Sequence, residues 1–137
     1  MKIEADQTRN YKKLHSLETS SGTLKAWQST QPVDDQWDDF LAATPGSHFN
    51  QTSMWAEVRR LDGWVPYIVV ITLNDDIIGG FQMLWRSKSY IGKIGLILKG
   101  PLVASEDPII ISFIIQMLKH VTKINKIRAL IIQPPDH

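Results

Sequence analysis

Cysteine is absent from the 137-residue sequence. This absence excludes disulfide bonds, thiolate metal sites and a cysteine nucleophile, and it is compatible with the reducing cytoplasm, where we expect the protein to be located. A large excess of charge of one sign is also missing, because 15 basic and 14 acidic residues give a formal net charge of +1. The composition therefore offers no bulk electrostatic attraction for nucleic acid or for an anionic membrane surface.

Long apolar runs are absent as well. The longest, PIIISFIIQML at residues 108–118, is far shorter than the roughly 20 residues that a membrane-spanning helix needs, so we expect no transmembrane segment. A hydrophobic fraction of 43% with 21% charged residues is typical of a globular chain. The length suits one domain with a modest core.

The motifs of common catalytic and metal sites are missing too. No pair among His15, His48, His120 and His137 has the spacing of metal ligands on one element, and there is no G-x-S-x-G elbow, P-loop or Rossmann fingerprint. His48 precedes a helix cap, and we interpret it as a loop residue with a satisfied hydrogen bond rather than as a functional group. We expect neither a bound metal nor a cofactor, and the residue pattern leaves the catalytic residues unknown.

Hydrophobic periodicity, capping residues and glycine or proline breaks predict strands and helices in turn. Residues 1–22 are polar and are expected to form a mobile tail. Residues 23–137 are expected to form one unit with a mostly antiparallel sheet and flanking helices, which is the α+β class. The predicted elements are a strand at 23–30, a helix at 34–44, a helix that begins at Thr52 or Ser53 and ends before Asp62-Gly63, strands at 64–72, 77–86 and 90–98, a helix at 106–123 and a strand at 126–135.

The apolar faces of the predicted helices differ in width. In the helix at 34–44, one stripe with i, i+3, i+4 spacing is formed by Trp37, Phe40 and Leu41. In the helix after Thr52, the predicted buried stripe consists of Met54, Trp55, Val58 and Leu61. The helix at 106–123 is apolar on nearly every side, whereas a helix on a single sheet needs only one stripe. Its surplus face is expected to meet another copy of the chain or a domain missing from it.

Two glycine-containing segments are candidates for a close approach of the backbone. Gly79-Gly80 interrupts the strand at 77–86 and predicts a β-bulge or a contact with another backbone. Lys99-Gly100-Pro101 follows the strand at 90–98, where the glycine admits a ligand to the backbone and the lysine supplies a cation for phosphate or carboxylate. A rigid turn at the strand end explains the same three residues, and on their spacing alone it is the favoured interpretation.

Four segments taken together resemble successive blocks of one protein family. They are HFNQTSMWAEVRRLDGWVPYIVV (48–70), IIGGFQML (77–84), LKGPLV (98–103) and IRALIIQPP (127–135). The family is the Fem family, which comprises peptidoglycan-bridge aminoacyl transferases and their relatives within the GNAT-like acyl-CoA N-acyltransferase superfamily. The resemblance covers residues 24–135, and its most specific parts are Gln51 with Trp55, and Lys99-Gly100-Pro101.

The resemblance implies a GNAT-like fold with two units in tandem, of which this chain is expected to be the first and incomplete half. It also implies transfer of an aminoacyl or acyl group to an amine of a cell-envelope or polysaccharide precursor. The expected acceptor is a nucleotide-linked or lipid-linked sugar-peptide. The donor, aminoacyl-tRNA or acyl-CoA, is expected to bind only through a second unit, because no Q/R-x-x-G-x-G/A loop precedes the helix at 106–123.

Site residues follow from the resemblance position by position. In characterised Fem enzymes a basic residue one turn after the motif tryptophan contacts the phosphates of the precursor, and Arg59 occupies that position here. The predicted substrate-binding residues are Arg59, Lys99, Gly100 and Pro101. The sequence departs from the family at Ala104, where an aspartate is frequent, and at Leu96, where an aromatic residue is expected. These departures favour a second hypothesis, a non-catalytic binding or assembly module that keeps the fold.

A homodimer is the expected assembly of this chain. The prediction rests on the surplus apolar face of the helix at 106–123, because large exposed apolar patches are uncommon on soluble monomers. A two-fold dimer is the simplest closed arrangement that covers such a face.

Overall fold

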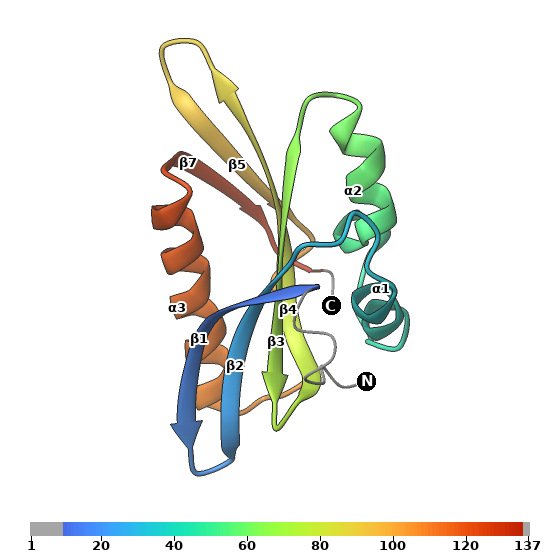
Figure 1. Ribbon diagram of the computed structural model, residues 1–137, viewed down its shortest axis with the longest axis vertical. Coiled ribbons are helices and arrows are strands. Elements are labelled where there is room, and N and C mark those ends of the chain that lie inside the picture. Colours follow the sequence, from blue (N-terminus) through green and yellow to red (C-terminus); the bar gives the residue numbers. More distant parts are fainter. Residues whose placement is uncertain (1–9, 136–137) are drawn as a thin grey trace.

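The chain folds into one open, twisted sheet with α3 on one face and α1 and α2 on the other (Figure 1). The computed structural model describes residues 10–135. Its elements, in chain order, are β1 (Tyr11–Thr19), β2 (Gly22–Ser29), α1 (Asp35–Ala42), the 3-10 helix η2 (Phe49–Gln51), α2 (Ser53–Arg60), β3 (Val65–Leu73), β4 (Asp76–Lys88), β5 (Gly92–Leu98), β6 (Leu102–Val103), α3 (Pro108–Ile124) and β7 (Ile127–Gln133). The architecture is the mostly antiparallel α+β fold that the sequence predicts.

The strands lie in the order β1-β2-β3-β4-β5-β7, and the short β6 pairs with β4. Consecutive strands from β1 to β5 pair antiparallel, whereas β5 and β7 are parallel. A parallel pair needs a crossover connection, because both strands must begin at the same end of the sheet. The segment containing β6 and α3 provides that crossover, and it leaves α3 packed on one face.

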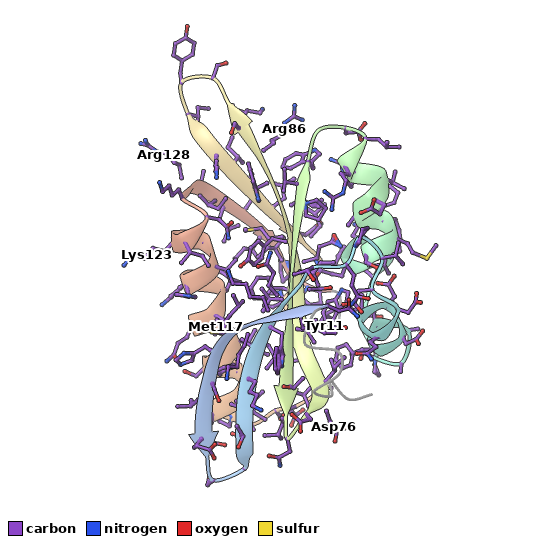
Figure 2. All side chains as sticks on the ribbon, viewed as in Figure 1. Tyr11, Asp76, Arg86, Met117, Lys123 and Arg128 are labelled. Atoms are coloured by element: carbon purple, nitrogen blue, oxygen red, sulfur yellow. The ribbon has the colours of Figure 1, made fainter. Side chains whose placement is uncertain are left out.

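The prediction of a polar tail over residues 1–22 is wrong for residues 11–19, which form β1 and pair with β2. The strand is not recognisable from the sequence, because β1 is an edge strand that exposes most of its side chains and so lacks an alternation of apolar residues. Tyr11 is its buried anchor, and its hydroxyl donates a hydrogen bond to Asp34 Oδ1 at 2.9 Å, beside α1 (Figure 2). Residues 1–9 lie outside the described part of the chain.

Two apolar clusters on opposite faces of the sheet form most of the core. One lies under α3 and includes Val69, Phe81 and Met117, and the other lies under α1 and includes Trp37, Phe40 and Val70. Because β3 and β4 are covered on both faces, their sequences read as nearly continuous apolar runs. The predicted stripe of α1 is confirmed, since Trp37, Phe40 and Leu41 are all buried.

Helix α3 presents more apolar residues than the sheet can cover. Asp107 caps it by accepting a hydrogen bond from the Ile109 N–H at 2.9 Å, and Pro108 lies in the first turn. The residues buried against the sheet are Ile110, Phe113, Ile114, Met117 and Val121. The large apolar side chains left exposed are Ile109 at 43%, Ile111 at 38%, Ile115 at 46% and Ile124 at 48%. The prediction of a surplus apolar face is therefore confirmed.

The predicted buried stripe of α2 is wrong. Met54, Val58 and Leu61 are exposed, Trp55 is only half-buried, and the buried residues are instead Ser53 and Ala56. The ring of Trp55 packs edge-on against Phe49 of the preceding turn, at 5.1 Å between ring centroids. The helix is held by polar contacts at its N-terminus, where Ser53 bonds to Asp38 through both its N–H and its hydroxyl. The small Ala56 packs against Trp64 and Leu84, so the periodicity of large apolar residues misidentifies the buried face.

The Gly79-Gly80 pair allows a close approach of backbone, as predicted. The register of β3 and β4 shifts between Ile71 and Thr72, which marks a bulge. A Cβ at Gly80, where φ is +148°, would collide with the Val69 carbonyl oxygen, and one at Gly79 would lie 2.6 Å from the Leu102 carbonyl oxygen. These glycines let β6 and α1 pack against β4.

Candidate functional site

Gln51 forms a fully buried clasp between η2 and the sheet. Its Oε1 accepts a hydrogen bond from the Gln82 N–H at 2.7 Å, and its Nε2 donates to the Leu98 carbonyl at 2.6 Å. Gln82 reciprocates, because its own Nε2 donates to the Thr52 carbonyl at 2.6 Å. Trp37 Nε1 donates to the Gln51 carbonyl at 2.8 Å. The clasp therefore ties α1, η2, β4 and the end of β5 together through buried polar groups.

The turn at Lys99-Gly100-Pro101 is built against this clasp. A Cβ on the buried Gly100 would lie only 2.9 Å from Gln51 Cδ, so the protein interior requires a glycine there. The backbone N–H groups of Lys99 and Gly100 both donate to the Gln133 carbonyl, at 2.7 and 3.3 Å. Lys99 adopts a φ of +60°, and the Gly100–Pro101 peptide is cis. Gln51 and the turn at Lys99-Gly100-Pro101 thus form one structural unit. Contacts within the protein explain much of why these residue types occur here, without a ligand.

Arg59 lies at the other end of α2. The helix rise of about 1.5 Å per residue places it roughly 9 Å along the axis from Ser53, at the start of the helix. The Arg59 guanidinium carbon lies 5.7 Å from the ring centroid of Trp64. Its Nη1 is 3.6 Å from Asp62 Oδ2, and its Nε is buried without a hydrogen-bond partner.

Trp64 and Arg86 lie beside Arg59, and neither periodicity nor a motif singled them out. Trp64 is buried in a small cluster with Ala56 and Leu84, and Leu96 packs against that cluster. The Arg86 guanidinium carbon lies 5.2 Å from the Trp64 ring centroid. Arg86 sits near the end of β4 beside β5 and α2 (Figure 2). The two-residue period of β4 is the sequence signal that could have pointed to Arg86. Leu84 and Arg86 are two positions apart and therefore lie on the same face of that strand.

A cleft of about 300 Å³ opens on the other side of α2. It is lined by residues 28–32 between β2 and α1, by Ala56 and Arg60 of α2, and by Pro66 and Ile68 of β3. Arg60, not Arg59, reaches this cleft, and its Nε is paired with Glu57 Oε1 at 3.1 Å. The two neighbouring arginines of α2 therefore lie on different surfaces of the protein.

Asp34 is a buried carboxylate that caps the N-terminus of α1. It accepts hydrogen bonds from the Tyr11 hydroxyl, the Ser29 hydroxyl at 2.7 Å and the Trp37 N–H at 3.0 Å. Burial raises the pKa of Tyr11 above its ordinary value of 10.0, and the nearby Asp34 charge raises it further. Because three donors satisfy the carboxylate, its role is to join β1, β2 and α1.

Residues 10–135 contain neither a metal-binding cluster nor a membrane-spanning helix. That part of the chain contains no group of three or more histidine, cysteine, aspartate or glutamate side chains placed to hold a metal. No helix in the same range has both the length and the apolar character to cross a bilayer. His48 accepts a hydrogen bond from the Asn50 N–H at 3.2 Å and caps η2, which confirms the structural interpretation of that histidine. His137 lies outside the described residues.

Comparison with known protein families matches residues 33–137 to the FemAB family. No curated protein sequence matches the chain. The matched range contains the Gln51 clasp, the Lys99 turn and Arg59, which are the features on which the resemblance rests. Since the match covers more than half of its length, the chain belongs to the FemAB family.

Proposed function

We propose that this chain is the acceptor-side portion of a Fem-like N-acyltransferase. Membership of the FemAB family points to an aminoacyl-transferase role in the synthesis of peptidoglycan bridges. In such a reaction an amine of the acceptor attacks the acyl carbonyl of the donor and a C–N bond forms. The bond from the acyl carbon to the donor's leaving group breaks, and the leaving group takes the electron pair and the proton that the amine loses. The proposed acceptor is a nucleotide-linked or lipid-linked sugar-peptide of the cell envelope. No catalytic residue is assigned.

The observation that carries the proposal is the set of contacts made by the Arg59 guanidinium. Its guanidinium is held beside Trp64, its Nε has no partner, and the acid that faces it is Asp62, whose side chain is 63% exposed. An arginine fork matches the geometry of phosphate oxygens and forms charge-assisted hydrogen bonds with them. Arg59 is therefore suited to bind the phosphates of an acceptor.

Lys99, Gly100 and Pro101 remain proposed binding residues with unequal support. Gly100 has a structural explanation in its contact with Gln51, and Lys99 brings a cation to the end of β5. The donor, aminoacyl-tRNA or acyl-CoA, is proposed to bind through a second GNAT-like unit rather than through these residues. A cytoplasmic location likewise stays a prediction.

The second candidate function is a binding or assembly module that keeps the fold without the chemistry. Leu96 favours it, since this residue packs beside Leu84 and Trp64 where the family more often carries an aromatic ring. The exposed isoleucines of α3 favour it too, and they flank a groove of about 220 Å³ lined by Pro101, Leu102, Val103, Ile111, Ile114 and Ile115. We propose that a second copy of the chain covers this apolar face in a homodimer.

The test of the acceptor role is a binding titration with a nucleotide-linked sugar-peptide. Arg59→Ala is expected to weaken binding roughly 10- to 100-fold, because a hydrogen bond to a charged group is worth about 1.5–3 kcal/mol and 1.4 kcal/mol is a factor of ten. Arg60→Ala is the matched control, since it removes the same charge from the next position of α2. Equal affinity of wild type and Arg59→Ala would remove Arg59 from the site. Absence of binding to both nucleotide-linked and lipid-linked acceptors would favour the module.

A further inference from the structure

Trp64 lies next to two guanidinium groups that come from different elements. The guanidinium carbons of Arg59 on α2 and Arg86 on β4 are 5.7 and 5.2 Å from the same ring centroid. The two carbons can therefore be no farther apart than the sum of these distances, about 11 Å. Cations so close to an indole face are attracted by its quadrupole, which orders long and flexible side chains.

The ring itself is firmly placed. Trp64 is buried, its side chain packs with Ala56 and Leu84, and its backbone N–H donates to the Arg59 carbonyl at 3.3 Å. Residues that alternate along β4 share one face, so Leu84 beneath the ring brings Arg86 to the same side of the sheet. The side chains of Arg59 and Arg86 are thus held by a rigid platform, and less entropy is lost when they bind a ligand.

The positive charge of these two arginines is poorly compensated within residues 10–135. Arg59 meets only the mostly exposed Asp62, at 3.6 Å, and Arg86 forms no salt bridge in that range. The neighbouring Arg60 shows the contrast, because it has a close pair in Glu57 at 3.1 Å. A second observation is independent of charge: Arg59 Nε is buried without an acceptor, although buried donors are nearly always satisfied.

We propose that Arg86 is a second anion-binding residue beside Arg59, and that the two arginines on the Trp64 platform bind a diphosphate group. The inference rests on the proposed function, in which Arg59 meets the phosphates of the acceptor. Each guanidinium fork takes a pair of oxygens from one anionic group, so two forks favour two linked phosphates over a single carboxylate or phosphate. A nucleoside diphosphate sugar and a polyprenyl diphosphate sugar share this chemistry.

The experiment is calorimetric titration of the full chain with inorganic pyrophosphate, orthophosphate and acetate at low and moderate ionic strength. Wild type is expected to bind pyrophosphate most tightly, and Arg86→Gln is expected to weaken pyrophosphate binding by about tenfold or more while changing orthophosphate binding less. Arg86→Lys should restore part of the affinity, because it keeps the charge and loses the fork. Arg60→Gln is the control and should behave as wild type. Nucleoside-linked and polyprenyl-linked diphosphate sugars then distinguish the source of the ligand.

The outcomes separate this inference from the proposed function. If Arg59→Gln weakens pyrophosphate binding and Arg86→Gln does not, the role of Arg86 is overturned while the acceptor role of Arg59 stands. If Arg86→Gln matters and Arg59→Gln does not, the two-arginine site and the observation behind the proposed function both fall. A loss of pyrophosphate preference in both variants, with native circular dichroism spectra, supports the paired site, since a merely structural role for Arg86 would not change selectivity between anions.

Discussion

Replacing Gln51 with leucine should destabilise the protein strongly, although the side chain touches no proposed ligand. Leucine has nearly the same bulk and cannot form hydrogen bonds. The change removes the acceptor of the Gln82 N–H at 2.7 Å and the donor to the Leu98 carbonyl at 2.6 Å. Both backbone groups then remain buried at the meeting point of η2, β4 and β5.

The expected loss follows from those two orphaned groups. A buried donor or acceptor left without a partner costs about 1–3 kcal/mol, so Gln51→Leu should lower the free energy of unfolding by about 2–6 kcal/mol. That is a large share of the roughly 5–15 kcal/mol that stabilises a typical domain. With a urea m-value of about 2 kcal/mol/M, the unfolding midpoint should fall by about 1–3 M.

Urea unfolding followed by circular dichroism and tryptophan fluorescence measures this loss. The matched control is Gln116→Leu, which makes the same chemical change at an exposed position of α3 and should alter stability by no more than about 0.5 kcal/mol. A Gln51→Leu variant as stable as the control would refute the conclusion that the clasp holds the three elements together.

Three further predictions follow from the same contacts. Gly100→Ala places a Cβ 2.9 Å from Gln51 Cδ and should cost about 1–3 kcal/mol; the cost should shrink in a Gln51→Ala background, and a double-mutant cycle without coupling would contradict the contact. Burial raises the pKa of both Tyr11 and Tyr67 above 10.0, so the stability that their neutral forms contribute is complete below pH 10 and declines as pH rises beyond it. Urea unfolding midpoints between pH 7 and 11 should show this decline, and Tyr11→Phe should make the midpoint fall less steeply with pH. Sedimentation over a concentration series should show self-association that Ile111→Glu and Ile115→Glu weaken; a single monomeric species at high micromolar concentration would mean that the exposed face of α3 does not drive dimer formation.

The boundaries and buried faces of individual elements can be predicted from the sequence where residues close together in the chain determine them. Asp107 and Pro108 are typical of a helix start and indicate where α3 begins, the spacing of Trp37 and Phe40 identifies the buried side of α1, and the β-branched run of β3 predicts a strand. The surplus of isoleucine on α3 is also visible, because a single sheet can bury only one stripe of a helix. Each of these features depends on neighbours within a few positions of the chain.

The proposed binding residues depend on contacts that no local sequence pattern records. Arg59 was predicted only through family resemblance, and the Lys99 turn was a weak candidate until the resemblance supported it. Arg86 was not predicted, because it lies 22 positions after Trp64 in the sequence and the pairing of β4 with β3 brings the two together. The requirement for glycine at position 100 is of the same kind, since Gln51 fills the space where its side chain would lie.

The errors at β1 and α2 have one physical origin. Both elements are held largely by polar contacts, Tyr11 with Asp34 in one case and Ser53 with Asp38 in the other, rather than by an apolar stripe. The sequence alone determined which segments are rich enough in apolar side chains to form the core and where their helices begin. Only the tertiary structure decided which polar groups meet in the interior and which cations share a surface, because a hydrogen bond or a cation–π contact depends on the position of both partners and periodicity describes only one.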